Sequence, residues 1–182
     1  MPKFAINNYP WDCKYQPKAE GYVARTPDAL RVTLTAWEQT IRAFEMETGG
    51  AVFKDSCLEF FFQPAPETDA RYINIEINPI GTMHIGIGEG RHGRTVLGEL
   101  PDGIAPITRI ERGKLWSVSY ELPFSWIQSL FPDFSHEGEI KLRGNFYACD
   151  ESIHPHFGTA FPVEAAQPDF HCPACFQEII IE

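Results

Sequence analysis

The sequence lacks long hydrophobic runs and has no surplus of positive charge. No segment approaches the ~20 consecutive apolar residues that a membrane-spanning helix needs. Lys and Arg number 15 against 25 Asp and Glu, which gives a formal net charge of −10. Binding to nucleic acid or to an anionic membrane surface requires a basic patch on the protein. We therefore expect neither nucleic acid nor a membrane among the partners of this chain.

Cysteine is also scarce, and its spacing is not that of a disulfide framework. The chain has 5 cysteines, and its first residues contain no apolar segment typical of a secretory signal. Together these observations favour reduced thiols and a cytoplasmic location.

One pair of cysteines has a spacing typical of functional sites. Cys172-Pro-Ala-Cys175 has the two-residue separation of a zinc half-site or of a redox pair. His154-Pro-His156 does not supply a matching second half-site, and a redox pair is expected at the start of a helix in a βαβ unit. We therefore interpret the pair as two loop thiols, and keep a metal or redox protein as an alternative.

No low-complexity linker or internal repeat divides the chain. Its 182 residues suit one domain with a substantial core. The 15 prolines and 14 glycines are scattered along the sequence, which indicates many short elements joined by turns. We expect a single domain over residues 1–182.

What the sequence does contain is a repeated alternation of apolar and polar residues, the pattern of half-buried antiparallel strands. Only residues 124–131 have apolar side chains spaced for one face of a helix. The N-terminal residues 1–20 are expected to form an extended arm, because Pro10 and Pro17 interrupt regular structure. This pattern predicts an all-β chain, an antiparallel β-sandwich of jelly-roll or immunoglobulin-like architecture with one short helix. The expected strands are residues 29–36, 57–63, 71–78, 81–90, 115–122 and 139–147, with weaker candidates at 41–47 and 176–182.

The polar face of two of these strands carries acids and amides. Glu59 lies on that face of the 57–63 run, and Asn74 and Glu76 lie on that face of the 71–78 run. If the strands pair, these side chains are neighbours, since opposed Cβ atoms are ~4.5–5.5 Å apart. Carboxylates and amides suit sugars because they accept and donate hydrogen bonds in a fixed plane. The alternatives are a solvated polar face, or a glycosidase that uses Glu59 and Glu76, since retaining enzymes need carboxyls about 5–5.5 Å apart.

The strand at 81–90 and the turn after it add basic residues near this face. His84 falls on its polar side, while Arg91 and Arg94 follow a glycine-rich turn. The arginines either reach a ligand or pair with the surplus acids. The glycines do not form a phosphate loop, because no helix follows them and GK[ST] is missing.

Several stretches resemble the carbohydrate-binding module family 9-like group of β-sandwich domains. They include KDSCLEFFF (54–62), RYINIEINPIGT (71–82), RGNFYACD (143–150) and PDFHCPACFQEI (168–179), in the order of the family and over nearly the whole chain. The resemblance implies a sugar-binding sandwich rather than an enzyme. In characterised members two aromatic side chains clamp a terminal sugar, and Phe53 and Phe170 match those positions.

The resemblance also assigns polar contacts to a mono- or oligosaccharide ligand. It implies calcium as a further candidate, since some members carry it, but gives no position for the ion. His171 follows the second clamp in the PDFH stretch and is included in the predicted site. The polar candidates are Glu59, Asn74, Glu76, Asn145, Tyr147 and His171.

Overall fold

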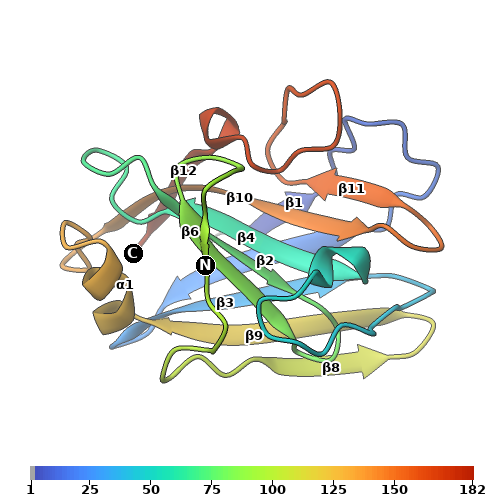
Figure 1. Cartoon of the computed structure of the whole chain (residues 1–182), viewed down its shortest axis with the longest axis horizontal. Helices are drawn as coiled ribbons and strands as arrows, with labels where there is room; N and C mark the ends of the chain where they lie inside the picture. Colours follow the sequence, from blue (N-terminus) through green and yellow to red (C-terminus); the bar gives the residue numbers. More distant parts are fainter. Residues whose placement is uncertain (1–2) are drawn as a thin grey trace.

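Two antiparallel β-sheets lie face to face in the computed structural model, which describes residues 3–182 (Figure 1). The buried side chains between the sheets form one large apolar cluster, to which both sheets contribute. The predicted antiparallel β-sandwich with one short α-helix is confirmed. The five-stranded sheet has the order β1 (Lys3–Ile6), β2 (Ala19–Arg25), β3 (Ala29–Ala36), β9 (Leu115–Pro123) and β8 (Ile107–Glu111).

The seven-stranded sheet carries the polar face that the sequence singles out. The long strand β10 has β4 on one side, and β11 and β12 share its other side. This sheet has the order β11 (His156–Thr159), β10 (Ile140–Asp150), β4 (Cys57–Gln63), β5 (Tyr72–Ile77), β6 (Met83–Gly88) and β7 (Thr95–Val96), with β12 (Gln177–Ile181) paired to β10.

The alternation of apolar and polar residues in β4 and β5 determines which face of this sheet packs on the core. Phe60 is fully buried and stacks on Phe146 of β10 with ring centroids 4.3 Å apart. Ile75 lies directly opposite Phe60 on β5 and is also fully buried. Burial of each such side chain contributes roughly 1.5–3 kcal/mol. Because successive residues leave opposite faces of a strand, this core fixes which side chains face outward.

The helix α1 (Phe124–Leu130) follows β9 directly, at one end of the sandwich (Figure 1). Phe124 and Ile127 are its buried residues, as the helical spacing predicts. Short 3-10 helices also occur, η1 (Val52–Lys54) and η2 (Pro173–Cys175). In residues 3–182 no helix is long and apolar enough to cross a bilayer.

The structure differs from the sequence prediction in several segments, and strands β2, β7, β8 and β11 were not among those expected. The N-terminal arm is wrong in part, because residues 3–6 form strand β1 and pair with β2. The strand expected at 41–47 is absent from the described chain. Instead the backbone amides of Phe44 and Glu45 both donate to Asp55 Oδ2 at 2.9 Å, which holds that segment as a loop.

The cysteines also differ from the expectation of reduced thiols. Cys172 and Cys175 are joined in a disulfide at η2. Among the described residues, Cys13, Cys57 and Cys149 are unpaired and buried. The cytoplasmic location stays a prediction.

Candidate functional site

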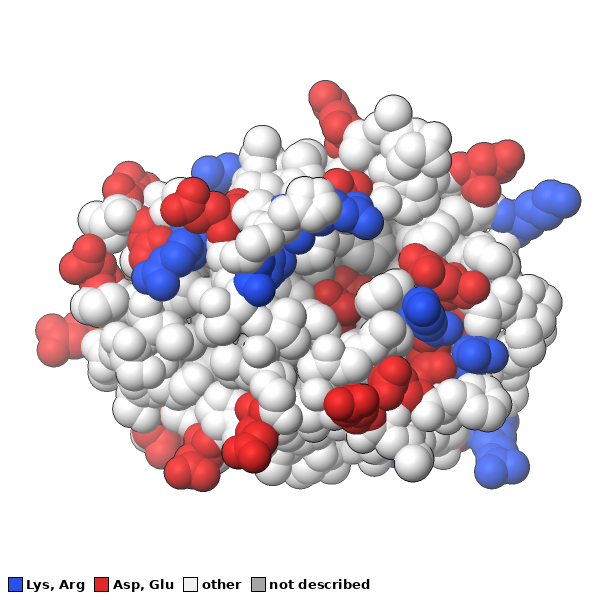
Figure 2. Space-filling view, viewed as in Figure 1, with Lys and Arg blue, Asp and Glu red and all other residues white. Residues whose placement is uncertain are grey.

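A pocket of about 470 Å³ opens on the outer face of the seven-stranded sheet. This volume falls in the range of small-molecule sites, roughly 300–1,000 Å³. Figure 2 shows the hollow on this face, with acidic side chains inside it and basic ones along its rim. The lining comes from η1, from strands β4, β5, β6, β7, β10 and β11, and from the loops that follow β6, β10 and β11. Its members are Phe53, Glu59, Phe61, Asn74, Glu76, His84, Arg91, His92, Gly93, Arg94, Val96, Cys149, Glu151, Phe157, Pro168, Asp169, Phe170 and His171.

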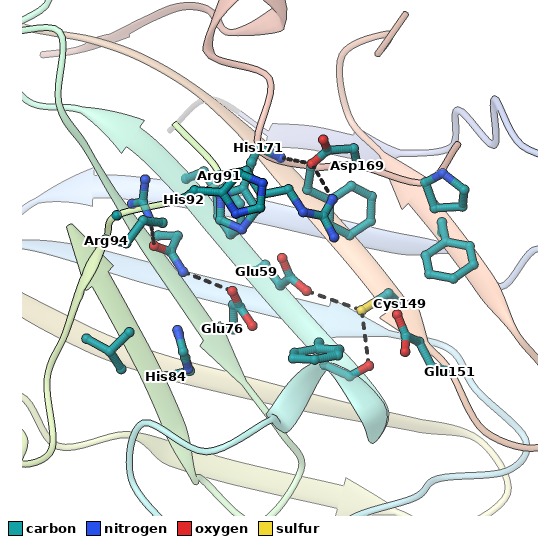
Figure 3. Close-up of a pocket in the computed structure, with 18 residues that line it drawn as sticks. Glu59, Glu76, His84, Arg91, His92, Arg94, Cys149, Glu151, Asp169 and His171 are labelled. Atoms are coloured by element: carbon teal, nitrogen blue, oxygen red, sulfur yellow. Dashed lines mark hydrogen bonds and ion pairs between the residues drawn. The ribbon is translucent and has the colours of Figure 1, made fainter. Parts of the chain in front are cut away.

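Two carboxyl groups form the floor of this pocket. Glu59 of β4 and Glu76 of β5 are directly opposed across the strand pair, and their residues are 1% and 5% exposed. The Asn74 side-chain amide donates to Glu76 Oε1 at 2.9 Å. The Cys149 thiol donates to Glu59 Oε1 at 3.2 Å, so Glu59 lies between Glu76 and Cys149 (Figure 3).

Burial changes the protonation of these carboxyl groups. It raises the pKa of Glu59 well above its ordinary value, and the neighbouring Glu76 raises it further. Burial raises the pKa of Glu76 as well, although His84, Asn74 and Arg94 oppose that shift. Two carboxyl groups this close do not ionise independently. The pair can therefore present a hydrogen-bond donor and an acceptor on the same floor.

Arg94 holds this floor in place without offering its own hydrogen bonds to a ligand. Its Nε donates to Asn74 Oδ1 at 2.9 Å, and its guanidinium lies 3.9 Å from the centre of the Tyr72 ring. The terminal nitrogens donate to the carbonyl oxygens of Tyr72, Gly86, Gly88 and Gly90 at 2.9–3.2 Å. These bonds engage all five guanidinium N–H groups. Arg94 thus orients Asn74, which in turn donates to Glu76.

The glycines of β6 leave room for this arrangement. A Cβ added at Gly86 would lie 2.4 Å from Asn74 Oδ1. A Cβ added at Gly88 would lie 3.2 Å from Cγ of Arg94. The glycine pattern that superficially suggests a phosphate loop therefore makes space above the sheet.

Aromatic side chains form one wall of the pocket. Phe170 stacks on Tyr147 with ring centroids 4.2 Å apart and an interplanar angle of 12°. Phe157 meets Phe170 edge-on with centroids 6.4 Å apart. Phe53 lies in η1, beside β4 in sequence. These contacts fix the orientation of the Phe170 ring before any ligand arrives.

His171 is held next to this wall. Its Nδ1 lies 2.7 Å from the hydroxyl oxygen of Tyr72. Burial and the charge of Arg94 lower the pKa of His171 to about 4. The ring is therefore neutral near pH 7, and its Nδ1 can accept a hydrogen bond from the Tyr72 hydroxyl.

Six of the eight residues predicted from the sequence line the pocket: Phe53, Glu59, Asn74, Glu76, Phe170 and His171. The other two lie behind its wall. The Asn145 amide donates to the Phe161 carbonyl at 3.0 Å and accepts from the Phe161 amide at 2.9 Å. The Tyr147 hydroxyl donates to the Phe170 carbonyl at 3.1 Å. Both hold neighbouring segments in place instead of facing the pocket.

The sequence reasoning missed several lining residues. The alternation of β4 places Phe61 on this outer face, but Phe61 was not among the predicted site residues. Asp169 was not predicted either; it forms an ion pair of 3.0 Å with Arg91, which was expected to reach a ligand or to pair with an acid, and the pair ties two loops together. Nothing in the sequence indicates that pairing, because the two residues are far apart along the chain.

The model of carbohydrate-binding family 9 matches residues 1–181. The chain belongs to carbohydrate-binding family 9. No curated protein matches it in sequence.

Solved structures place this family 9 chain among similar sandwiches. A protein from Bacteroides uniformis ATCC 8492, proposed to bind carbohydrate, is 25% identical with a TM-score of 0.85, over 100% of this chain and 87% of that one. Family 9 modules from Caldicellulosiruptor kristjanssonii were solved with glucose (10% identity, 84% of that chain covered) and with cellotriose (11% identity, 83% covered). Both cover 100% of this chain with a TM-score of 0.66, which shows a shared fold.

Calcium does not fit the one cluster of ligand side chains that residues 3–182 bring together. That cluster consists of Cys57, Glu59 and Cys149, whose ligand atoms all lie within 4.8 Å of one another. Calcium takes six to eight oxygen ligands, roughly, and two of these three atoms are sulfur. The chemistry of the cluster therefore favours a softer ion than calcium.

Proposed function

We propose that the pocket binds a mono- or oligosaccharide without catalysing a reaction on it. The observation that carries this proposal is the opposed Glu59 and Glu76 pair at the bottom of an aromatic-walled pocket. Membership of family 9 supports it, and so do the glucose and cellotriose bound by the Caldicellulosiruptor modules.

The floor has hydrogen-bonding capacity that a sugar can use. Within residues 3–182, no group donates a hydrogen bond to Glu76 Oε2, although that atom is buried. A buried polar atom without a partner costs about 1–3 kcal/mol. A sugar hydroxyl that donates to this oxygen removes that cost. The Glu76 side chain is in turn held by Asn74 and, through Asn74, by Arg94.

The aromatic wall complements the other face of a sugar. The C–H bonds of a pyranose ring are weakly positive, and the face of an aromatic ring is negative. Phe170 presents such a face in a fixed orientation because Tyr147 stacks behind it. We therefore assign Phe170 and Phe53 to ring contacts, and Glu59 and Glu76 to hydroxyl contacts.

The direct test is sugar binding by a variant of the floor. A glycan array with the purified protein identifies the ligand, and calorimetry then compares the wild type with Glu76→Gln. The Gln side chain has one acceptor oxygen where Glu76 has two, so it loses one hydrogen bond from the sugar. We therefore expect sugar association to weaken at least tenfold, or by ~1.4 kcal/mol. Glu178→Gln, at an exposed position of β12 and outside the pocket, is the matched control and should bind normally. If Glu76→Gln binds the sugar as tightly as Glu178→Gln does, the proposal is wrong.

Opposed carboxyl groups on neighbouring strands are also what a retaining glycosidase would use, with a carboxyl separation of about 5–5.5 Å. Incubation of the wild type with a panel of aryl glycosides separates the two functions. Binding without release of the aryl alcohol supports the proposal. If the wild type releases the aryl alcohol and Glu76→Gln does not, the pocket catalyses hydrolysis and the binding proposal is wrong.

A further inference from the structure

A pair of thiols lies directly beside the floor of the pocket. Cys57 of β4 and Cys149 of β10 are opposed across the strand pair, and Glu59 follows two residues after Cys57 on the same face. All three residues are buried, with exposures of 0%, 2% and 1% for Cys57, Cys149 and Glu59. Figure 3 shows Cys149 with its sulfur directed at Glu59.

The separation of these atoms is close to that of a metal site. A tetrahedral zinc ion with Zn–S of ~2.3 Å and Zn–O of ~2.0 Å sets sulfur and oxygen ~3.5 Å apart, and two sulfurs ~3.8 Å apart. The Cys149 Sγ to Glu59 Oε1 distance is 3.2 Å, and no pair among the three ligand atoms exceeds 4.8 Å. Small side-chain rotations would bring all three to one ion.

We propose that Cys57, Glu59 and Cys149 form a binding site for a thiophilic divalent ion such as Zn²⁺. Two thiolates and one carboxylate match the ligand preference of zinc and not that of calcium or magnesium. A coordinated thiol loses its proton, so binding releases protons and strengthens as the pH rises. The two thiolates and the carboxylate carry three negative charges, which more than balance the +2 charge of the ion in this buried position.

The pocket provides the route of entry. Cys149 and Glu59 line it, whereas Cys57 lies behind them. Three protein ligands leave a fourth tetrahedral position, which a water molecule or a ligand hydroxyl can occupy. Because Glu59 serves both the ion and the proposed sugar site, the two ligands must influence each other, and by the same factor in both directions. This coupling alone rests on the proposed function.

Cobalt provides a spectroscopic test that does not require a sugar. Reduced protein is titrated with Co²⁺, and thiolate-to-cobalt charge-transfer absorption is followed, with Zn²⁺ added last to displace the cobalt. We expect one equivalent to bind. Cys149→Ser should weaken Co²⁺ binding by more than ~10–100-fold, the loss that follows mutation of a residue that only supports a metal ligand. Cys13→Ser, a buried thiol outside this cluster, is the matched control and should retain the full signal.

Cys172 and Cys175 are the competing thiols once their disulfide is reduced. The double variant Cys172→Ser/Cys175→Ser should keep the absorption if the proposal is correct. Loss of the absorption in this double variant, or no thiolate band in the wild type, overturns it. If Cys149→Ser does not fold, Glu59→Gln serves in its place. That variant keeps both thiols and should bind cobalt more weakly, with a changed visible spectrum.

Discussion

Gly86→Ala tests whether the geometry of the pocket floor depends on the space that β6 leaves. The added Cβ would lie 2.4 Å from Asn74 Oδ1 and 3.2 Å from its Cγ. Asn74 is 1% exposed and is bonded on one side to Arg94 and on the other to Glu76. It therefore cannot move away without breaking at least one of these hydrogen bonds.

The magnitude follows from those two bonds. Each involves a charged or ionisable partner, and such hydrogen bonds contribute roughly 1.5–3 kcal/mol. We expect Gly86→Ala to lower the free energy of unfolding by about 2–4 kcal/mol, with the overpacking included. Loss of the orientation of Glu76 should also weaken sugar binding by about tenfold or more.

Urea unfolding and calorimetric sugar titration measure the two effects separately. Gly90→Ala is the matched control, because a Cβ there meets no atom of the described residues within 4 Å. Stability and affinity of Gly86→Ala equal to those of Gly90→Ala would refute this reasoning. If Gly86→Ala lowers stability but not affinity, the hydrogen bonds that link Arg94, Asn74 and Glu76 stabilise the fold but do not support sugar binding.

Three further predictions concern the wall, its support and the interior. Phe170→Ala should weaken sugar association about tenfold in calorimetry, because it removes the ring that Tyr147 holds in place. Asn145→Ala should lower the free energy of unfolding in urea by about 1–3 kcal/mol, since two backbone groups of Phe161 lose their partner. Glu38 is fully buried, and burial raises its pKa from 4.5 to about 7, so the native state loses stability as the pH rises through that interval. Glu38→Gln should therefore raise the melting temperature above pH 7, where ionisation costs ~3 kcal/mol, and the gain should shrink as the pH falls toward 4.5.

The facing carboxyl groups could be predicted from the sequence because alternation leaves little freedom. Once Phe60 and Ile75 must face the core, a register shift of one residue would expose them. Glu59 and Glu76 then have to share the outer face. The same reasoning located strand β3 and most of β9 without error.

The supporting contacts could not be predicted in this way. Arg94 bonds to backbone carbonyls of β5 and β6, which are common to all residues and leave no mark on the sequence. Asn145 has the alternation of an outward-facing residue, yet a segment that returns over the sheet covers it. The alternation at 41–47 gave a wrong strand because the buried Asp55 carboxylate binds that backbone.

The most direct test of the central claim is to locate the bound sugar on the protein. The isotopically labelled chain is titrated with the sugar selected on the array, and backbone amide shifts are followed by NMR. The account predicts that the largest shifts cluster at Glu59, Asn74, Glu76 and Phe170, on the outer face of the seven-stranded sheet. Shifts confined to the five-stranded sheet, or no response to any sugar, would contradict it.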